Sequence, residues 1–316
     1  MGSLGRLVFF GTPEFAVPSL EALVKSGWAP VKVYTQPSRP SGRGRRVHPS
    51  AVARRARDLG LDVEEVAAVR ETAFLSALRV LGPDLAVVVA FGQIFPAELL
   101  RVPKRGCVNV HASLLPAFRG AAPVQAAILD GSEETGVTTM LMDEGMDTGP
   151  ILLQRRTRIE ARETSGELTG RLAVLGAELL IETLRRLEEG DLEPKPQPEI
   201  GVSYAPRLSR ESGTIDWRAE AEEIFRRLRA FTPWPGLTTS FRGQPLKIVW
   251  GEPLGPLPGM PLPGGSLVLL EDGDLAVACG GKRLFRLDRV QRPGRRVVTG
   301  REFRNGEQPA AGERME

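Results

Sequence analysis

The 316-residue sequence is long enough for about two domains, and its 41% hydrophobic residues suffice for a full core, which excludes a disordered or fibrous protein. Its longest apolar run, residues 85–91, is far shorter than the roughly 20 residues that cross a bilayer, and two cysteines exclude a disulfide framework. No charged segment followed by an apolar one opens the chain, so we expect a cytoplasmic protein without a membrane anchor.

The net charge of +3 is unevenly distributed along the chain. Residues 282–304 hold nine basic and two acidic side chains, and residues 36–49 hold no acidic side chain at all. The arginines of this second stretch are Arg39, Arg43, Arg45 and Arg46. Such stretches attract nucleic-acid phosphates, but in a sequence with 36 arginines and six lysines they are also typical of a solvated surface.

In the first part of the chain, short apolar runs alternate with helical patterns, which is typical of βαβ units and a mostly parallel, Rossmann-like sheet. Strands are predicted at 7–10, 31–35, 85–90, 107–111 and 137–142. Helices are predicted at 13–27, 50–59, 72–81 and 165–189. Residues 36–49 have no apolar periodicity and are predicted to be a loop.

The polar segment 190–206 is stiffened by three closely spaced prolines and is predicted to be a linker. It separates an α/β domain at 1–189 from a smaller domain at 207–316. After a helix at 219–230, strands are predicted at 237–241, 246–250, 266–270, 275–278 and 283–290. Five short strands with basic faces predict a small β-barrel like the oligonucleotide-binding fold.

Several common catalytic motifs are absent from the sequence. The turn after the first strand lacks the second glycine of a dinucleotide fingerprint, and the only Gly-Lys pair is followed by Arg283, so there is no P-loop. No serine has glycines at both −2 and +2, which excludes the nucleophile elbow of hydrolases. Two histidines and two distant cysteines do not suggest a zinc site. We therefore expect a metal-free mechanism without a covalent intermediate.

A polar pair stands out at the end of one predicted strand. Asn109 and His111 are two residues apart, so they share a face, and ligands of open α/β sheets bind at the carboxyl ends of strands. Asp143 and Asp147 follow the strand at 137–142. Taken alone, the first pair also fits a capped strand end, and the two aspartates also fit a turn that their own side chains stabilise.

Together these residue types support one chemistry. An amide can donate to a developing oxyanion, an imidazole can move a proton between two nitrogens, and a carboxylate can orient the imidazole. This set can transfer a one-carbon acyl group from one nitrogen to another without an enzyme nucleophile.

The segments around these residues resemble a known family. Residues 109–116 and 119–123 are similar to the core motif of folate-dependent formyltransferases, and residues 136–149 resemble their second signature. The segments 10–16, 36–46, 215–217 and 231–235 resemble the branch of the family that acts on methionyl initiator tRNA. One departure is Ala117-Phe118, where the family commonly has a basic and then an aromatic residue.

The resemblance implies that 10-formyltetrahydrofolate is the co-substrate and that the α-amino group of methionyl initiator tRNA is the acceptor, for translation initiation. It implies catalytic roles for Asn109, His111 and Asp147, no metal, no membrane partner and a monomer. The implied folate contacts are Phe91, Gly92, Ile94, Ser113, Leu114, Leu115, Pro116 and Asp143, although Phe91 and Ile94 also fit an ordinary core. The implied tRNA contacts are Arg39, Arg43, Arg45 and Arg46, with Arg43 at the weak first base pair of the acceptor stem.

Three other interpretations stay open from the sequence. The first is a formyltransferase that acts on an amine of a sugar nucleotide or a small ribotide, against which the 36–49 loop argues. The second is a hydrolase that transfers the formyl group to water. The third is a non-catalytic RNA-binding protein, against which the presence of all three catalytic residue types argues.

Overall fold

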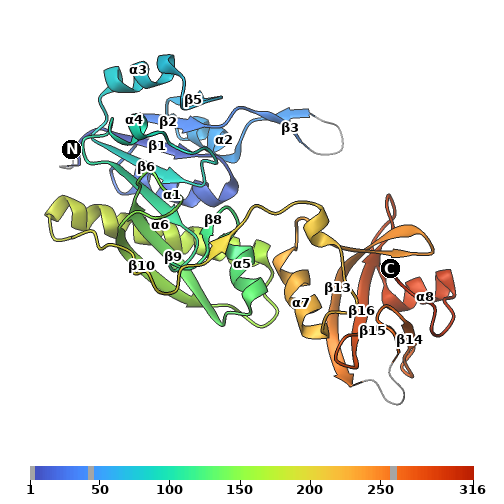
Figure 1. Cartoon of the computed structure of the whole chain (residues 1–316). Helices are drawn as coiled ribbons and strands as arrows, with labels where there is room; N and C mark the ends of the chain where they lie inside the picture. The colour runs from blue at the N-terminus through green and yellow to red at the C-terminus, as the bar shows by residue number, and fades with distance from the viewer. Residues whose placement is uncertain (1–3, 42–45, 257–261) are drawn as a thin grey trace. The chain divides into compact units, whose positions relative to one another are not determined.

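The computed structural model describes residues 4–41, 46–256 and 262–316, and its contacts divide the chain into two compact units (Figure 1). Unit 1 holds the described residues up to Pro123, together with Glu134–Arg158 and Leu168–Ala205. Unit 2 holds Val124–Glu133, Ile159–Glu167 and the described residues of Pro206–Glu316. Within these residues, no helix has the length and apolar composition of a membrane span.

Unit 1 is built on a seven-stranded sheet with the order β10-β9-β7-β6-β1-β2-β5. The five strands from β7 to β5 are parallel, whereas β9 runs antiparallel to β7 and β10 antiparallel to β9. The strands are β1 (Leu7–Gly11), β2 (Lys32–Thr35), β5 (Val63–Glu65), β6 (Leu85–Val89), β7 (Cys107–His111), β9 (Glu134–Leu141) and β10 (Ile151–Arg158). The predicted mostly parallel α/β sheet is therefore confirmed.

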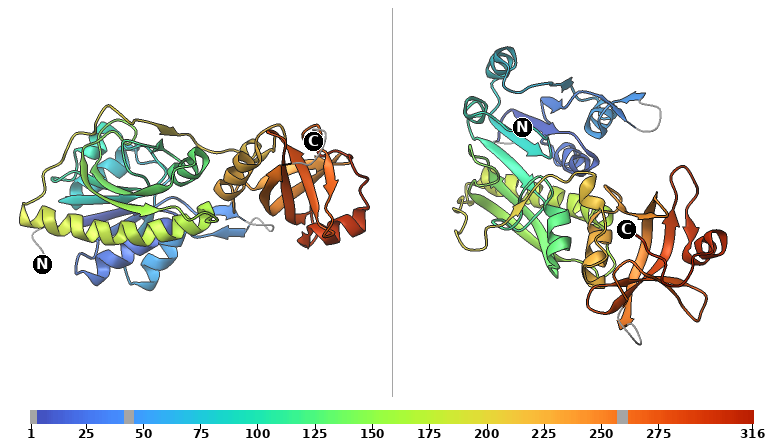
Figure 2. Two further views of the ribbon diagram at one scale, coloured as in Figure 1. Left: turned by 90° about the horizontal axis from the view of Figure 1, so that it is seen from below. Right: turned by 45° about the vertical axis from the view of Figure 1, so that its right-hand side comes forward.

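Helices cover both faces of this sheet, as Figure 2 shows for the long helix α6. They are η1 (Glu14–Ala16), α1 (Val17–Lys25), α2 (Ala51–Asp58), α3 (Thr72–Leu81), α4 (Ala97–Leu100) and α6 (Ser165–Glu189). Because strand side chains alternate, Phe9 packs in the core beneath α1, α2 and α6, while Phe10 packs in the core beneath α3 and α4.

The stretch 36–49 is not a plain loop. β3 (Arg39–Ser41) and β4 (Arg46–His48) pair antiparallel, which periodicity could not predict because backbone pairing of a short ribbon needs no apolar face. Ser38, just before β3, donates through its backbone N–H to the Glu65 carboxylate at 2.8 Å and so fixes one end of the ribbon. Arg43 and Arg45 lie outside the described residues, and for Arg39 and Arg46 only the backbone is described.

Two edge strands of the sheet were missed by the sequence analysis. Most residues of β10 are only partly buried or exposed, and β5 has the sequence Val-Glu-Glu with no fully buried residue. Edge strands carry polar side chains because one side of the strand is open to solvent, so they lack the apolar pattern on which strand prediction depends.

Unit 2 contains an antiparallel sheet with the order β12-β13-β16-β15-β14, and β17 pairs with β16. The strands are β12 (Leu237–Phe241), β13 (Gln244–Pro256), β14 (Leu267–Leu269), β15 (Leu275–Cys279), β16 (Arg283–Gln291) and β17 (Val298–Thr299). Residues 313–316 join the two edges: Glu316 exchanges backbone hydrogen bonds with Ser240 of β12, and Leu267 of β14 donates to Glu313 at 2.7 Å. The remaining elements are α5 (Pro123–Asp130), η2 (Glu211–Gly213), α7 (Ala221–Ala230) and α8 (Gly300–Glu307). The five predicted strands are thus present in one antiparallel sheet.

Candidate active site

Strand β7 presents Asn109 and His111 on one face of the sheet. Val108 and Val110, which alternate with them, lie in the same core cluster as Leu180 of α6. Asn109 and His111 therefore point to the opposite face, the one covered by α3 and α4. His111 ends the strand, so this pair lies at the carboxyl edge of the parallel strands, where the sequence analysis expected a site.

The structure brings His111 and Asp147 together from separate segments. His111 is buried, and its Nδ1 lies 3.7 Å from Asp147 Oδ2. Its Nε2 lies 3.0 Å from the carbonyl oxygen of Phe118. Because a carbonyl can only accept, Nε2 carries a proton and Nδ1 is the nitrogen that faces the carboxylate. The ring is thus held in one orientation between a carbonyl and a carboxylate.

The Asp147 carboxylate is oriented by the left-handed backbone of its own residue and by the backbone N–H of Gly120. Asp147 itself has φ +55°, in the left-handed region that few residues other than glycine, Asn and Asp adopt. Its Oδ2 also accepts a hydrogen bond from the backbone N–H of Gly120 at 2.8 Å. Gly120 has φ +123°, and a Cβ there would lie 2.6 Å from the carbonyl of Ala205, so only glycine fits.

Asp143 stabilises the same loop. Its Oδ1 accepts from the backbone N–H of Gly145 at 3.1 Å and from the Thr148 hydroxyl at 2.7 Å. Asp143 therefore stabilises a turn with its own side chain, which the sequence allowed as the alternative to a folate contact.

The amide of Asn109 has no partner within the described residues. Its Oδ1 is buried without a hydrogen bond, and neither amide N–H donates to another group of the chain in this part of the structure. A buried polar atom left unpaired costs about 1–3 kcal/mol, so such atoms are rare and need an explanation. The side chain is available to a ligand that can pair with it.

The turn after β7 is pinned to strand β9 by Thr138. The Thr138 hydroxyl donates to the Ser113 carbonyl at 2.7 Å and accepts from the Leu115 backbone N–H at 3.1 Å. The Ser113 side chain is fully buried and donates to the Ala117 carbonyl at 2.6 Å, while the Leu115 side chain is buried. Leu114 and Pro116 remain partly exposed. Of the four predicted folate contacts in this turn, two therefore have accessible side chains.

The loop after β6 lies at the point where the strand order reverses, between β1 and β6. The Phe91 ring is buried against Phe10 and Phe95, so this side chain is a core residue, as the sequence left open. Gly92 has φ +86°, and Ile94 is 63% exposed. Of the three predicted contacts here, the backbone at Gly92 and the Ile94 side chain are accessible on the surface of this loop.

Two polar residues of the predicted linker also belong to this part of unit 1. Gln197 is bonded to the Asp147 loop and to Arg119, and the Ser203 hydroxyl accepts from the backbone N–H of Phe118 at 2.9 Å. Neither residue is predicted from the sequence, since a polar residue in a proline-rich segment gives no pattern that distinguishes it from its solvated neighbours.

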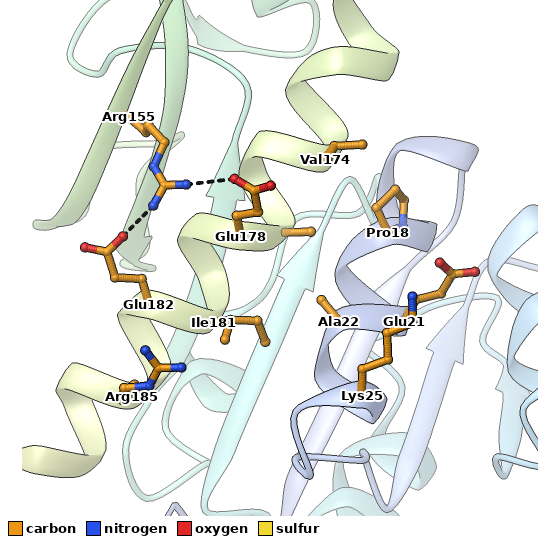
Figure 3. A pocket seen from close by; sticks show the side chains of 11 residues that line it. Pro18, Glu21, Ala22, Lys25, Arg155, Val174, Glu178, Ile181, Glu182 and Arg185 are labelled. Atoms are coloured by element: carbon orange, nitrogen blue, oxygen red, sulfur yellow. Dashed lines mark hydrogen bonds and ion pairs between the residues drawn. The ribbon is translucent and has the colours of Figure 1, made fainter.

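A groove of about 670 Å³ lies elsewhere in unit 1, between α1 and α6 (Figure 3). Arg155 is paired there with Glu178 and Glu182, and none of the predicted site residues lines it. It is formed by helices on the sheet face opposite Asn109 and His111, so it is not part of the candidate site. Among the described residues, no group of three or more His, Cys, Asp or Glu side chains is placed to hold a metal ion.

Comparison with known proteins identifies the family. Residues 5–184 match the family model described as formyl transferase, and residues 207–308 match the formyl transferase C-terminal domain. The methionyl-tRNA formyltransferase of Acidiphilium cryptum is 48% identical over 98% of this chain and 99% of its own length, and that of Methylococcus capsulatus is 46% identical over 98% and 99%. The chain belongs to the methionyl-tRNA formyltransferase family. The predicted family and the predicted enzymatic activity, formylation of methionyl-tRNA for translation initiation, are therefore confirmed.

Solved structures show how widely the fold of this family is shared. The sugar 3N-formyl transferase WlaRD superposes with a TM-score of 0.67 at 18% identity, covering 93% of this chain and all of that one. The N-formyltransferase of Helicobacter canadensis superposes with a TM-score of 0.65 at 21% identity, covering 89% of this chain and 98% of that one. At these identities the likeness concerns the fold, whereas methionyl-tRNA formyltransferases resemble this chain in sequence over nearly its whole length.

Much of the positive charge of the basic stretch 282–304 in unit 2 is compensated by nearby carboxylates in the structure. Five of its arginines form ion pairs with carboxylates: Arg283 with Glu222, Arg286 with Asp288, Arg292 with Glu307, Arg296 with Glu302 and Arg301 with Asp274. Three of these partners come from outside the stretch. Lys282, Arg289 and Arg295 are exposed and have no ion pair within the described residues. The ninth basic residue, Arg304, is partly buried and donates to the carbonyl of Gly273, so Lys282, Arg289 and Arg295 are the exposed basic groups most available to an anionic ligand.

Proposed function

We propose that Asn109, His111 and Asp147 carry the formyl transfer, in a direct attack of the amine on the formyl group of 10-formyltetrahydrofolate. The observation that supports this most strongly is the unpaired amide of Asn109 on the same strand face as the buried His111–Asp147 pair. The N–H groups of this amide donate to no group among the described residues, and a free donor on the strand face of an oriented imidazole is the arrangement that a developing oxyanion requires.

In the proposed step, the free α-amine of methionyl initiator tRNA attacks the formyl carbon. The carbonyl oxygen gains the negative charge and accepts hydrogen bonds from the Asn109 amide and from His111. The C–N10 bond then breaks, the amine loses one proton, and N10 gains one, with His111 or a water as the relay. Since Nε2 donates to the Phe118 carbonyl at 3.0 Å, the substrate has to displace that carbonyl for Nε2 to take part.

Asp147 would hold His111 in position during this step. Its carboxylate is fixed by the Gly120 N–H and faces Nδ1, so it stabilises the ring when both nitrogens carry protons. We expect replacement of His111 by Ala to cost more than the ~10²–10³-fold typical of one lost oxyanion donor, because the proton relay is lost with it.

We propose that the folate lies against the turn after β7, the loop after β6 and the loop that carries Asp143. Ile94, Leu114 and Pro116 offer apolar contact, and the backbone at Gly92 is exposed and offers hydrogen-bonding groups. Because the Asp143 Oδ1 is engaged within its loop, only its other oxygen is open to a ligand.

We propose that tRNA is bound by Arg39, Arg43, Arg45 and Arg46 of the β3–β4 stretch and by the basic stretch 282–304 of unit 2. This assigns catalysis and the tRNA contact of the β3–β4 stretch to residues 1–189, and further tRNA binding to residues 207–316, with 190–206 between them, in a monomer that acts in the cytoplasm. Replacing Arg43 by Leu should lower activity on initiator tRNA, because leucine cannot bind the first base pair as the arginine is proposed to do. A variant that is fully active on initiator tRNA would remove this role.

The three unpaired basic groups allow a sharper test of the unit 2 surface. The tRNA-binding constant is measured at several salt concentrations, and its logarithm is plotted against the logarithm of the salt concentration. Replacing Lys282, Arg289 and Arg295 together by Gln should make this slope shallower by about 1 for each phosphate that the variant no longer neutralises. The matched control replaces Arg283 and Arg301, whose charges are already compensated by Glu222 and Asp274. An unchanged slope in the triple variant would show that these three groups do not bind the phosphates, and equal flattening by the control would show that the ion-paired arginines bind them as well.

One assay tests the reaction as a whole. Labelled 10-formyltetrahydrofolate is supplied with charged initiator tRNA, with charged elongator tRNA or with water alone, and the formyl group is then located. We expect label on the initiator tRNA. Release of formate at an equal rate without tRNA would contradict the proposed direct attack by the amine.

A further inference from the structure

Gln197 occupies an unusual place in the proline-rich segment after α6. Between residues 193 and 200 it is the only residue that is not exposed. Its Nε2 donates to the carbonyl of Asp147 and to the carbonyl of Gly149, each at 2.8 Å. Its Oε1 accepts from Nε and Nη2 of Arg119, at 3.1 and 2.7 Å. Two donors and two acceptor positions are all that a side-chain amide has, so Gln197 is fully satisfied.

These bonds reach the two segments that determine the position of the Asp147 carboxylate. One pair fixes the backbone of Asp147 and of Gly149, two residues further on. The other pair fixes Arg119, whose neighbour Gly120 donates its N–H to Asp147 Oδ2 at 2.8 Å. Gln197 therefore connects the loop that carries the carboxylate to the segment that orients it.

The backbone of Asp147 needs such a support. Its φ of +55° costs less for Asp than for most residues with a side chain, but it still costs free energy that the surrounding contacts have to offset. A peptide that relaxed to negative φ would swing the carboxylate away from His111 Nδ1, which lies 3.7 Å from it. Displacements of about 1 Å at a reacting group can cost on the order of 10²-fold in rate.

We propose that Gln197 is a positioning residue of the formyl transfer, which acts through Asp147 by holding its loop in the left-handed conformation. The proposal rests on the catalytic role proposed for Asp147. The proposal makes this one residue of the segment 190–206 part of the catalytic apparatus, whereas the composition of the segment indicated only a spacer.

The first test distinguishes the donor bonds of the Gln197 amide from its acceptor bonds. Gln197→Leu removes all four bonds, whereas Gln197→Glu keeps an acceptor for Arg119 but loses the donors to Asp147 and Gly149. We expect both variants to lose roughly 10–100-fold in kcat with little change in the KM for either substrate. The matched control is Glu199→Leu in the same segment, an exposed side chain without a partner among the described residues, and it should retain full activity. A Gln197→Glu enzyme with near-normal kcat would assign the role to Arg119 and overturn the proposal.

The second test is a double-mutant cycle with Asp147→Asn, measured in single turnovers with excess enzyme so that slow rates can be followed. If Gln197 acts through the carboxylate, Gln197→Leu should cost less than about 3-fold once Asp147 is already Asn. An undiminished 10–100-fold loss in that background would show a general structural defect and overturn the proposal. Near-normal activity of Asp147→Asn alone would instead remove the catalytic role of Asp147, a result distinct from failure at Gln197.

Discussion

Replacing Asn109 by Ala should separate activity from stability, because the side chain has no partner within the described residues. In the free protein its Oδ1 is buried and unpaired, and an orphan of this kind costs about 1–3 kcal/mol. Truncation removes that penalty but also removes the packing of a partly buried side chain, and the two effects oppose each other. We therefore expect the free energy of unfolding to change by no more than about 1 kcal/mol, or roughly 2–4 °C in Tm.

The same change should lower kcat by ~10²–10³, since one oxyanion donor contributes about 2.7–4 kcal/mol in the transition state. Unfolding could not mimic this loss. A 100-fold loss through unfolding alone would require that only one molecule in a hundred stays folded. For this the free energy of unfolding would have to fall from about 5–15 kcal/mol to roughly 3 kcal/mol below zero.

The assay combines thermal unfolding with formyl transfer at saturating concentrations of both substrates. Asn305→Ala is the control, since the only other asparagine of the chain lies exposed on α8 and should change neither quantity. The reasoning would be refuted by a folded Asn109→Ala enzyme with near-normal kcat. It would also be refuted by a large loss of stability, because that would show that the Asn109 amide supports the fold.

Other expectations follow from single groups. Gly120→Ala should destabilise the protein by about 2 kcal/mol or more and lower kcat, because φ is +123° and the new Cβ would lie 2.6 Å from the carbonyl of Ala205. Gly170→Ala, on an exposed turn of α6 with open space for a Cβ, should instead raise Tm, since alanine favours the helix by about 1 kcal/mol; a lower Tm would contradict this. Burial raises the pKa of the Cys107 and Cys279 thiols to about 12, so neither should react with a thiol reagent at pH 8 until the protein is unfolded. With the folded pKa above the unfolded value, their contribution to stability is complete below about pH 9 and is lost as the pH rises toward 12, which denaturant titrations across that range would measure.

The helices and strands that could be predicted from the sequence are those with a regular spacing of apolar residues. The apolar run 85–90 and the Leu spacing of 165–189 predicted β6 and α6 because burial of one face imposes a period. The alternation of Val108 and Val110 with Asn109 and His111 likewise placed the polar pair on one face of β7. Because the sequence motifs are long, they also indicated the family, which the relatives at 44–48% identity confirm.

The contacts that hold the site together could not be predicted from the sequence and are seen only in the folded protein. The approach of Asp147 to His111, the left-handed backbone at Asp147 and the bonds from Gln197 join three segments that are far apart in the sequence. Hydrogen bonds of this kind impose no period on the chain, so Gln197 looked like any polar residue of a spacer. For Phe91 the sequence left both a ligand contact and a core position open, and its ring packs in the core. Composition records which groups are available, whereas the partner of each group depends on contacts that form only when the sheet has assembled.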